Sequence, residues 1–269
     1  MSIALGIVGG GVMGEAILSR LLAQGRYAPE AILASDPSPQ RREYLQQQYG
    51  IRVAADNREA ATASDILLLA TKPQVLDRVA PELAQPAPDS PKPLVVSILA
   101  GVRLARLEAA LPGYPIVRAM PNTPATVGAG MTAIALSEQA STEQCQRARA
   151  ILEAVGQVIE LPEPLLDGAT GVAGSGPAYV AMAIEALADG GVAAGLSRAS
   201  AYQLALQTVL GTAQLLQASG QHPAELKDRV TSPGGTTIAA VGVLERAGFR
   251  AALADAVRAA QQRAGELGQ

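Results

Sequence analysis

The chain has few aromatic residues and almost no histidine or cysteine. Its 269 residues include no Trp, one Phe, one His and one Cys. Hydrophobic residues make up 49 % of the chain, and most of them are therefore aliphatic. The single cysteine, Cys145, excludes an internal disulfide and a thiolate metal site. We therefore predict no metal centre and a reducing, cytoplasmic environment. Cys145 lies in a segment, 142–155, that we expect to be helical, with the thiol buried rather than nucleophilic.

Two further absences limit the partners of the chain. The formal net charge is −3, from 21 basic and 24 acidic residues, and the basic residues form no cluster that could follow a nucleic-acid backbone. No apolar run reaches the length of a membrane span without Gly, Pro or a charge. The first residues also lack the basic region of a signal peptide. These patterns predict neither a nucleic-acid nor a membrane partner.

A glycine-rich segment near the N-terminus is the first positive signal. The apolar run 3–8 predicts a strand, residues 15–24 predict a helix, and Gly9, Gly11 and Gly14 lie between or at the start of them. Glycines at this spacing allow a tight turn, close approach of a pyrophosphate, and close packing of helix on strand. A purely structural turn would show the same three glycines, but the flanking strand and helix favour dinucleotide binding.

Apolar strands and helices then alternate through the first half of the chain. Continuous apolar strands of this kind predict a parallel, doubly wound sheet with both faces covered. The proline-rich stretch 81–93 predicts a surface connection. We therefore expect an α/β Rossmann-type domain over residues 1–162. The predicted strands are 3–8, 31–35, 51–53, 66–70, 94–98 and 116–118, with further candidates at 130–135 and 158–161.

The second half, residues 163–269, has no convincing strand and predicts an all-α domain. Ser197 is a plausible N-cap and Gly220 a plausible helix end. Wide apolar faces on about 105 residues are too much for so small a domain to bury alone, so we expect a homodimer through these helices. The predicted helices are 177–194, 198–218, 223–230, 236–246 and 250–267.

Scarce acid–base residues narrow the chemistry. His222 is the only histidine, and Lys72, Lys92 and Lys227 are the only lysines. A ketone or alcohol dehydrogenase needs a strong acid or base for the proton on oxygen, whereas a protonated imine already carries the charge that attracts a hydride. This scarcity gives mild support for imine reduction. We expect His222 to start a helix rather than to act as a catalyst.

Residues 232–237 form the best candidate for substrate binding. Ser232, Gly234, Gly235, Thr236 and Thr237 directly precede an apolar helix. Backbone N–H groups at a helix start, together with hydroxyls, can bind a carboxylate without arginine. The alternative is an ordinary Ser-Pro cap and turn.

The chain resembles the pyrroline-5-carboxylate reductase family along its whole length. Four motifs carry the resemblance in the same order as in that family. They are Thr71-Lys72-Pro73, Arg118-Ala119-Met120-Pro121-Asn122-Thr123-Pro124, Gly174-Ser175-Gly176-Pro177-Ala178-Tyr179, and 223–245 with Ser232-Pro233-Gly234-Gly235-Thr236-Thr237 at its centre.

The resemblance implies a reaction and a set of residues. Hydride would pass from NADPH, or from NADH, to the ring C=N of 1-pyrroline-5-carboxylate, giving L-proline. Residues 232–237 would hold the substrate carboxylate, with Thr237 beside the ring nitrogen as an orienting donor and proton relay. Asn122 would brace the turn near the nicotinamide. The cofactor residues would be Val8, Gly9, Gly10, Gly11, Val12, Met13, Gly14, Ser35, Asp36, Asn57, Ala70, Thr71, Lys72, Pro73, Ile98, Leu99, Ala100 and Asn122.

Asp36 leaves the choice of cofactor open. It ends the second strand, where a carboxylate accepts the ribose 2′-OH of NAD and repels the 2′-phosphate of NADP. Ser35, Ser38, Arg41 and Arg42 are nevertheless near enough in sequence to hold a phosphate. NADP(H) is the default of the family, with NAD(H) as the alternative.

Two other functions compete with the imine reductase. A β-hydroxyacid dehydrogenase shares the two-domain plan but relies on a lysine in the helical domain, and no lysine lies between Lys92 and Lys227. A non-enzymatic dinucleotide sensor would need the bend at 232–237 to be vestigial, although all its hydroxyls and glycines are present. Assembly of the dimers into a larger ring is left open by the sequence.

Overall fold

The computed structural model describes residues 2–84 and 92–267, which form two compact units. The first unit contains the chain up to Gly174 together with its last residues from Ala259, and the second runs from Ser175 to Arg258. The division between the units lies later in the chain than the predicted domain boundary after residue 162.

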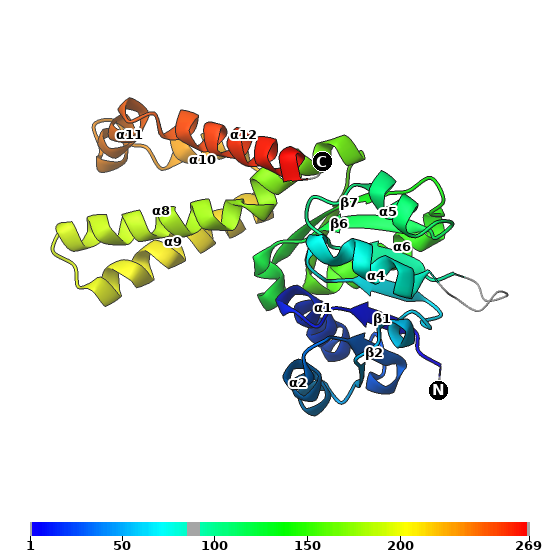
Figure 1. Cartoon of the computed structure of the whole chain (residues 1–269). Coiled ribbons are helices and arrows are strands. Elements are labelled where there is room, and N and C mark those ends of the chain that lie inside the picture. Colours follow the sequence, from blue (N-terminus) through cyan, green and yellow to red (C-terminus); the bar gives the residue numbers. More distant parts are fainter. Residues whose placement is uncertain (1, 85–91, 268–269) are drawn as a thin grey trace. The chain divides into compact units, whose positions relative to one another are not determined.

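The first unit is built on one sheet with helices packed against it (Figure 1). Within the described residues the sheet has eight strands in the order β3-β2-β1-β4-β5-β6-β7-β8. β2 and β3 lie on one side of β1, and β4 with the later strands lies on the other. Doubly wound sheets bind nucleotides at this switch in strand order, between β1 and β4. The strands are β1 Leu5–Val8, β2 Ile32–Ser35, β3 Arg52–Ala54, β4 Ile66–Leu69, β5 Leu94–Ser97, β6 Ile116–Met120, β7 Gly130–Leu136 and β8 Gly156–Glu160.

Both faces of the sheet are covered, as the continuous apolar strands predicted. Alternate residues of β4 enter different cores: Leu67 and Leu69 pack with α3, α4, α5 and α7, whereas Ile66 and Leu68 pack with α1, α2 and α6. These helices are α1 Val12–Ala23, α2 Pro39–Tyr49, α3 Asn57–Ala60, α4 Leu76–Leu83, α5 Leu104–Ala110, α6 Thr142–Leu152 and α7 Leu166–Ala169. Short 3-10 turns occupy Pro29–Ala31, Pro73–Val75, Thr123–Val127, Glu153–Val155 and Glu163–Leu165, and a π-helix occupies Thr170–Gly174.

The predicted parallel sheet is confirmed for β1 to β6, whereas the further strand predicted at 130–135 runs in the opposite direction. β1 to β6 are parallel, but β7 runs antiparallel to β6, with Val117 opposite Leu136 and Met120 opposite Ala133. Only the short turn Thr123–Val127 lies between them. A parallel partner needs a crossover of a dozen or more residues, so this connection forces a reversal. The longer connection through α6 then makes β8 parallel to β7.

Part of the predicted proline-rich connection is helical. Pro81 lies inside α4, close to its C-terminal end, where the missing N–H removes only one of the last helical hydrogen bonds. Residues 85–91 of the predicted connection lie outside the described residues.

The second unit is helical throughout its described length. It contains α8 Gly176–Ala193, α9 Arg198–Ser219, α10 Pro223–Arg229, α11 Thr236–Arg246 and the larger part of α12 Phe249–Leu267. α8 and α9 pack against each other through Ala188, Ala201 and Ala205. Both predicted ends of α9 are confirmed: the Ser197 side chain accepts a hydrogen bond from the Ser200 N–H, and Gly220 has a φ of 65°.

Candidate active site

The glycine loop after β1 has the geometry of a dinucleotide-binding turn. A Cβ at Gly9 would lie 2.7 Å from the Ala70 carbonyl oxygen, and one at Gly14 would lie 2.6 Å from the Gly9 carbonyl oxygen. Gly9 also has a φ of 100°, which side-chain-bearing residues rarely adopt. Gly11, in contrast, faces open space and caps α1 without any side-chain hydrogen bond. The N-terminus of α1 therefore remains open to a pyrophosphate, and the residues fit a dinucleotide.

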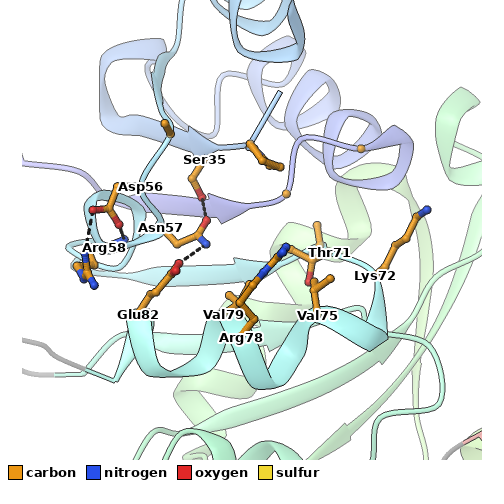
Figure 2. Close-up of a pocket in the computed structure, with 15 residues that line it drawn as sticks. Ser35, Asp56, Asn57, Arg58, Thr71, Lys72, Val75, Arg78, Val79 and Glu82 are labelled. Carbon is orange, nitrogen blue, oxygen red and sulfur yellow. Dashed lines mark hydrogen bonds and ion pairs between the residues drawn. The ribbon is translucent and has the colours of Figure 1, made fainter. Parts of the chain in front are cut away.

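Beside this loop lies a cavity of about 630 Å³. It brings together predicted residues that end or follow four strands, β1, β2, β3 and β4. These are Gly9, Gly11, Ser35, Asn57, Ala70, Thr71 and Lys72. The cavity also contains residues that sequence reasoning missed: Pro37, Ala55, Asp56, Arg58, Val75, Arg78, Val79 and Glu82 (Figure 2). Its volume falls within the ~300–1,000 Å³ range of small-molecule sites.

A chain of hydrogen bonds crosses the cavity and holds Asn57 in place (Figure 2). The Ser35 Oγ donates to Asn57 Oδ1 at 2.7 Å, and Asn57 Nδ2 donates to Glu82 Oε2 at 2.6 Å. Ser35 is fully buried, so its hydroxyl requires such a partner. No local motif marks Glu82, because its role depends on a contact with a residue 25 positions away.

Not every predicted cofactor residue lines this cavity. The side chains of Val8 and Leu99 are 0 % and 2 % exposed and belong to the core under α4, so only their backbone atoms could contact a ligand. Asp36 lies at the end of β2, and its Oδ2 accepts the Gly10 N–H at 3.0 Å. The remaining predicted residues outside the cavity lining are Gly10, Val12, Met13, Gly14, Pro73, Ile98, Ala100 and Asn122.

The motif at the end of β6 braces the first unit. Asn122 Nδ2 donates to the Ala173 carbonyl oxygen of the π-helix at 3.0 Å, and Asn122 Oδ1 accepts the Met131 N–H at 2.9 Å. Arg118, only 5 % exposed, donates to Glu163 Oε1 at 2.8 Å. Both side chains therefore fix the segment that leads out of the sheet. The role expected for Asn122 beside the nicotinamide stays a prediction.

The predicted substrate bend lies in the second unit. The Gly235 N–H donates to the Ser232 carbonyl oxygen at 3.1 Å, and Gly234 has a φ of 65°. A Cβ at Gly235 would lie 2.3 Å from Ser232 Oγ, so a side chain there would displace the Ser232 hydroxyl. The bend opens α11 without any side-chain cap, contrary to the alternative of an ordinary serine cap. The first N–H groups of α11, at Thr236 and Thr237, have no acceptor within the helix and are suited to an anion.

Two residues predicted to be outside the chemistry have structural roles. The His222 Nδ1 accepts the Ala224 N–H at 3.2 Å and caps α10. Cys145 is buried in α6, where burial and the Glu160 carboxylate raise the pKa of its thiol.

Comparison with known proteins tests the resemblance. A family model described as "Pyrroline-5-carboxylate reductase dimerisation" matches residues 163–267, and one described as "NADP oxidoreductase coenzyme F420-dependent" matches residues 4–101. The pyrroline-5-carboxylate reductase of Synechocystis sp. is 62 % identical over 269 residues and 100 % of both chains. The chain belongs to the pyrroline-5-carboxylate reductase family.

Solved structures of this family share the whole fold. The pyrroline-5-carboxylate reductase of Coxiella burnetii matches with a TM-score of 0.93 and 35 % identity over 100 % of both chains. The Plasmodium falciparum structure, which has NADP bound, matches with a TM-score of 0.86 and 31 % identity over 99 % of this chain and 98 % of that one. Family membership and these matches confirm the predicted fold class, a Rossmann-type domain followed by a helical one. Within residues 2–84 and 92–267, none of the helices combines the length and apolarity required to cross a bilayer.

Proposed function

We propose that the chain catalyses the reduction of 1-pyrroline-5-carboxylate to L-proline with NAD(P)H, the last step of proline biosynthesis. The observation that carries this proposal is the match to reductases of that name over the full length of both chains. The match includes both the glycine loop and the bend at 232–237. A hydroxyacid dehydrogenase or a dinucleotide sensor accounts for the first of these features but not for the second.

The cofactor residues follow the strand ends. The glycine loop, from Val8 to Gly14, holds the pyrophosphate at the open N-terminus of α1. Ser35, Asp36 and Asn57 hold the adenosine ribose, with Glu82 fixing Asn57. The segments 70–73 and 98–100 complete the site toward the nicotinamide, which Asn122 supports through the strands it braces.

The substrate residues work without a strong acid. The N–H groups and hydroxyls of Ser232, Gly234, Gly235, Thr236 and Thr237 bind the substrate carboxylate, and the Thr237 hydroxyl orients the ring nitrogen. When bound, the reduced nicotinamide supplies a hydride to the carbon of the C=N bond. The π electrons of that bond then become the lone pair on nitrogen, so a substrate that binds as the protonated imine needs no further proton. This balance is compatible with a bend that contains no His, Lys, Asp or Glu.

The helical second unit supports a homodimer. Large apolar side chains on α8 and α9, among them Met182, Leu187, Tyr202 and Leu204, are 54–68 % exposed in the single chain. A second copy of the same surface would bury them, and pairs of dimers could close into a larger ring. The single cysteine is a free, buried thiol, which suits a reducing compartment, so the enzyme is proposed to act in the cytoplasm.

Substitution of Thr237 tests both the reaction and the role of the bend. Thr237→Ala should lower kcat about tenfold to a hundredfold, since one hydrogen bond to the reacting imine is lost, while NAD(P)H binding stays unchanged. Nicotinamide oxidation is measured with 1-pyrroline-5-carboxylate, with a β-hydroxyacid, and in buffer alone. Thr237→Ser should restore most of the rate, and Thr212→Ala, on the exposed side of α9, is the matched control.

Two outcomes would contradict the proposal. Turnover of the hydroxyacid but not of the imine would favour a hydroxyacid dehydrogenase. Proline formation by Thr237→Ala at the wild-type rate would remove this hydroxyl from the mechanism.

A further inference from the structure

The turn after β2 already holds an anion, the carboxylate of Asp36. Its Oδ2 accepts the Gly10 N–H at 3.0 Å, and its Oδ1 accepts the Ser38 N–H at 2.9 Å. These two N–H groups point from the glycine loop and from the start of α2 toward the same place. They are the donors that a phosphate at the end of β2 would use, and Asp36 occupies both.

The nearest cation is also engaged. Arg41 Nε donates to the Gly10 carbonyl oxygen, and Arg41 Nη2 forms an ion pair with Glu15. The guanidinium lies 5.0 Å from the centre of the Tyr44 ring. Side chains of Arg41 and Glu15 are 27 % and 21 % exposed, so this pair is well sheltered from water.

Glu15 is held in its charged form. Burial alone would raise the pKa of Glu15, but hydrogen bonds from Arg41, Tyr49 and Tyr44 outweigh it and lower the pKa. The two tyrosine hydroxyls lie 2.7 Å and 3.0 Å from Glu15 Oε1. An ionised Glu15 therefore neutralises Arg41 at neutral pH, and this arginine offers no free positive charge to an incoming phosphate.

The other candidates for holding a phosphate have partners as well. Arg42 Nη1 donates to the carbonyl oxygens of Asp36 at 2.7 Å and Pro37 at 3.1 Å. Ser38 Oγ accepts the Arg41 N–H at 3.3 Å and donates to Gln40 Oε1 at 3.1 Å. Ser38 and Arg42 are thus hydrogen-bonded within the turn, and Arg41 is paired with Glu15 of α1.

We infer that this turn selects NADH over NADPH. Asp36 accepts a hydrogen bond from the ribose 2′-OH, and Glu15 pairs with Arg41 so that this arginine does not bind a 2′-phosphate. A carboxylate has lone pairs beyond the two already used, so it can accept a ribose hydroxyl. A 2′-phosphate, in contrast, would place its negative charge against that of Asp36. The inference rests on the proposed use of NAD(P)H and goes beyond it by naming the preferred dinucleotide and the residues that set the preference.

Binding of the two reduced dinucleotides tests the inference without any turnover. The chain has no Trp, so nicotinamide fluorescence can be followed directly in a titration of the full-length protein. The wild type should bind NADH at least tenfold more tightly than NADPH. Asp36→Asn, which removes the charge but keeps an acceptor, should lower this ratio about tenfold.

Glu15→Gln separates the second residue from the first. It leaves Arg41 without its counter-charge, so NADPH affinity should rise about threefold or more relative to NADH affinity. The double variant should favour NADPH more than either single one. Glu43→Gln removes an exposed carboxylate from α2, the helix that carries Arg41, and is the matched control, with no change in the ratio expected. Thermal unfolding followed by circular dichroism checks that each variant is folded.

The outcomes distinguish this inference from the proposed function. Equal or tighter binding of NADPH by the wild type, or an unchanged ratio in folded Glu15→Gln, would overturn the selectivity while leaving imine reduction intact. Failure of both dinucleotides to bind would overturn the proposed function together with the inference.

Discussion

The two units of the chain bury different kinds of side chain. In the sheet unit, two cores enclose large aliphatic residues such as Ile7, Leu67 and Ile116, all at most 1 % exposed. In the helical unit, the buried cluster within the described residues consists of Ala188, Ala201 and Ala205, and the large side chains lie outside. The sheet unit is therefore complete as a single chain, whereas the helical unit has apolar surface that only a partner can cover.

The difference reflects how each unit obtains its stability. Burying a Leu side chain contributes about 1.5–3 kcal/mol, and the sheet unit collects many such contributions within one chain. In the proposed dimer, the large apolar side chains of the second unit would obtain the same contribution between chains. The stability of the second unit should accordingly depend on protein concentration, and that of the first should not.

A charge on the exposed face of α9 should have the largest effect. Leu204 is 57 % exposed, and Leu204→Asp would place a carboxylate in the apolar surface that the proposed dimer buries. The cost should be on the order of 4 kcal/mol, or roughly a thousandfold in dimer affinity. Sedimentation equilibrium should then show a monomer at micromolar concentration.

The matched control is an exposed apolar residue of the sheet unit. Ile159, on β8, is 42 % exposed, and Ile159→Asp should leave the mass unchanged. A Leu204→Asp protein with the same mass as the wild type would show that α9 is not the dimer face. The two units would then differ less than proposed.

Truncation of a buried leucine should have a smaller effect, and one that does not depend on concentration. Leu67, in β4, is fully buried, so Leu67→Ala should reduce the free energy of unfolding by about 3 kcal/mol at every protein concentration. Leu204→Ala should show its cost only where the dimer forms. Urea unfolding at two protein concentrations a hundredfold apart measures both. If the loss of unfolding free energy in Leu67→Ala depended on protein concentration, the sheet unit would not be stable independently of the dimer.

Local patterns predicted most of the fold and the glycine loop. Gly9, Gly11 and Gly14 act through their own backbone and their immediate neighbours, so the spacing alone carries the information. The alanine-rich helices and the caps at Ser197 and Gly220 are equally local. The antiparallel β7 was missed because the length of the turn before it, and not the composition of the strand, decides its direction.

Contacts between distant residues were the part that the sequence could not supply. Glu82 holds Asn57, and Asp36 holds the Gly10 N–H, across 25 and 26 positions. Arg41 looked available for a phosphate because no acidic residue lies three or four positions from it along its own helix. Its partner, Glu15, comes from α1 and becomes visible only when the two helices are placed on the same face of the sheet.

The smallest expected effect concerns the only thiol, in the core of the sheet unit. Burial in α6 and the Glu160 carboxylate, 3.6 Å from Cys145 Sγ, raise the pKa of Cys145. A group with a raised native pKa stabilises the fold fully below its unfolded pKa of about 8.5, and this contribution is lost as the pH rises through the native pKa. The free energy of unfolding should therefore fall further in the wild type than in Cys145→Ala between pH 7.5 and 10.

The same thiol placed in the helical unit gives the comparison its control. Ala218 is exposed near the end of α9, so Cys145→Ala with Ala218→Cys carries a thiol whose pKa should hardly change on folding. Between pH 7.5 and 10 the free energy of unfolding of this double variant should fall by the same amount as that of Cys145→Ala alone. Urea unfolding at fixed protein concentration measures all three proteins, and the titration of other groups cancels in the differences. An equal loss of unfolding free energy in the wild type and in Cys145→Ala would mean that the thiolate is as stable in the core of the sheet unit as in water. The proposed difference between the two units, a buried core in the sheet unit and exposed apolar helices in the other, would then be contradicted at Cys145.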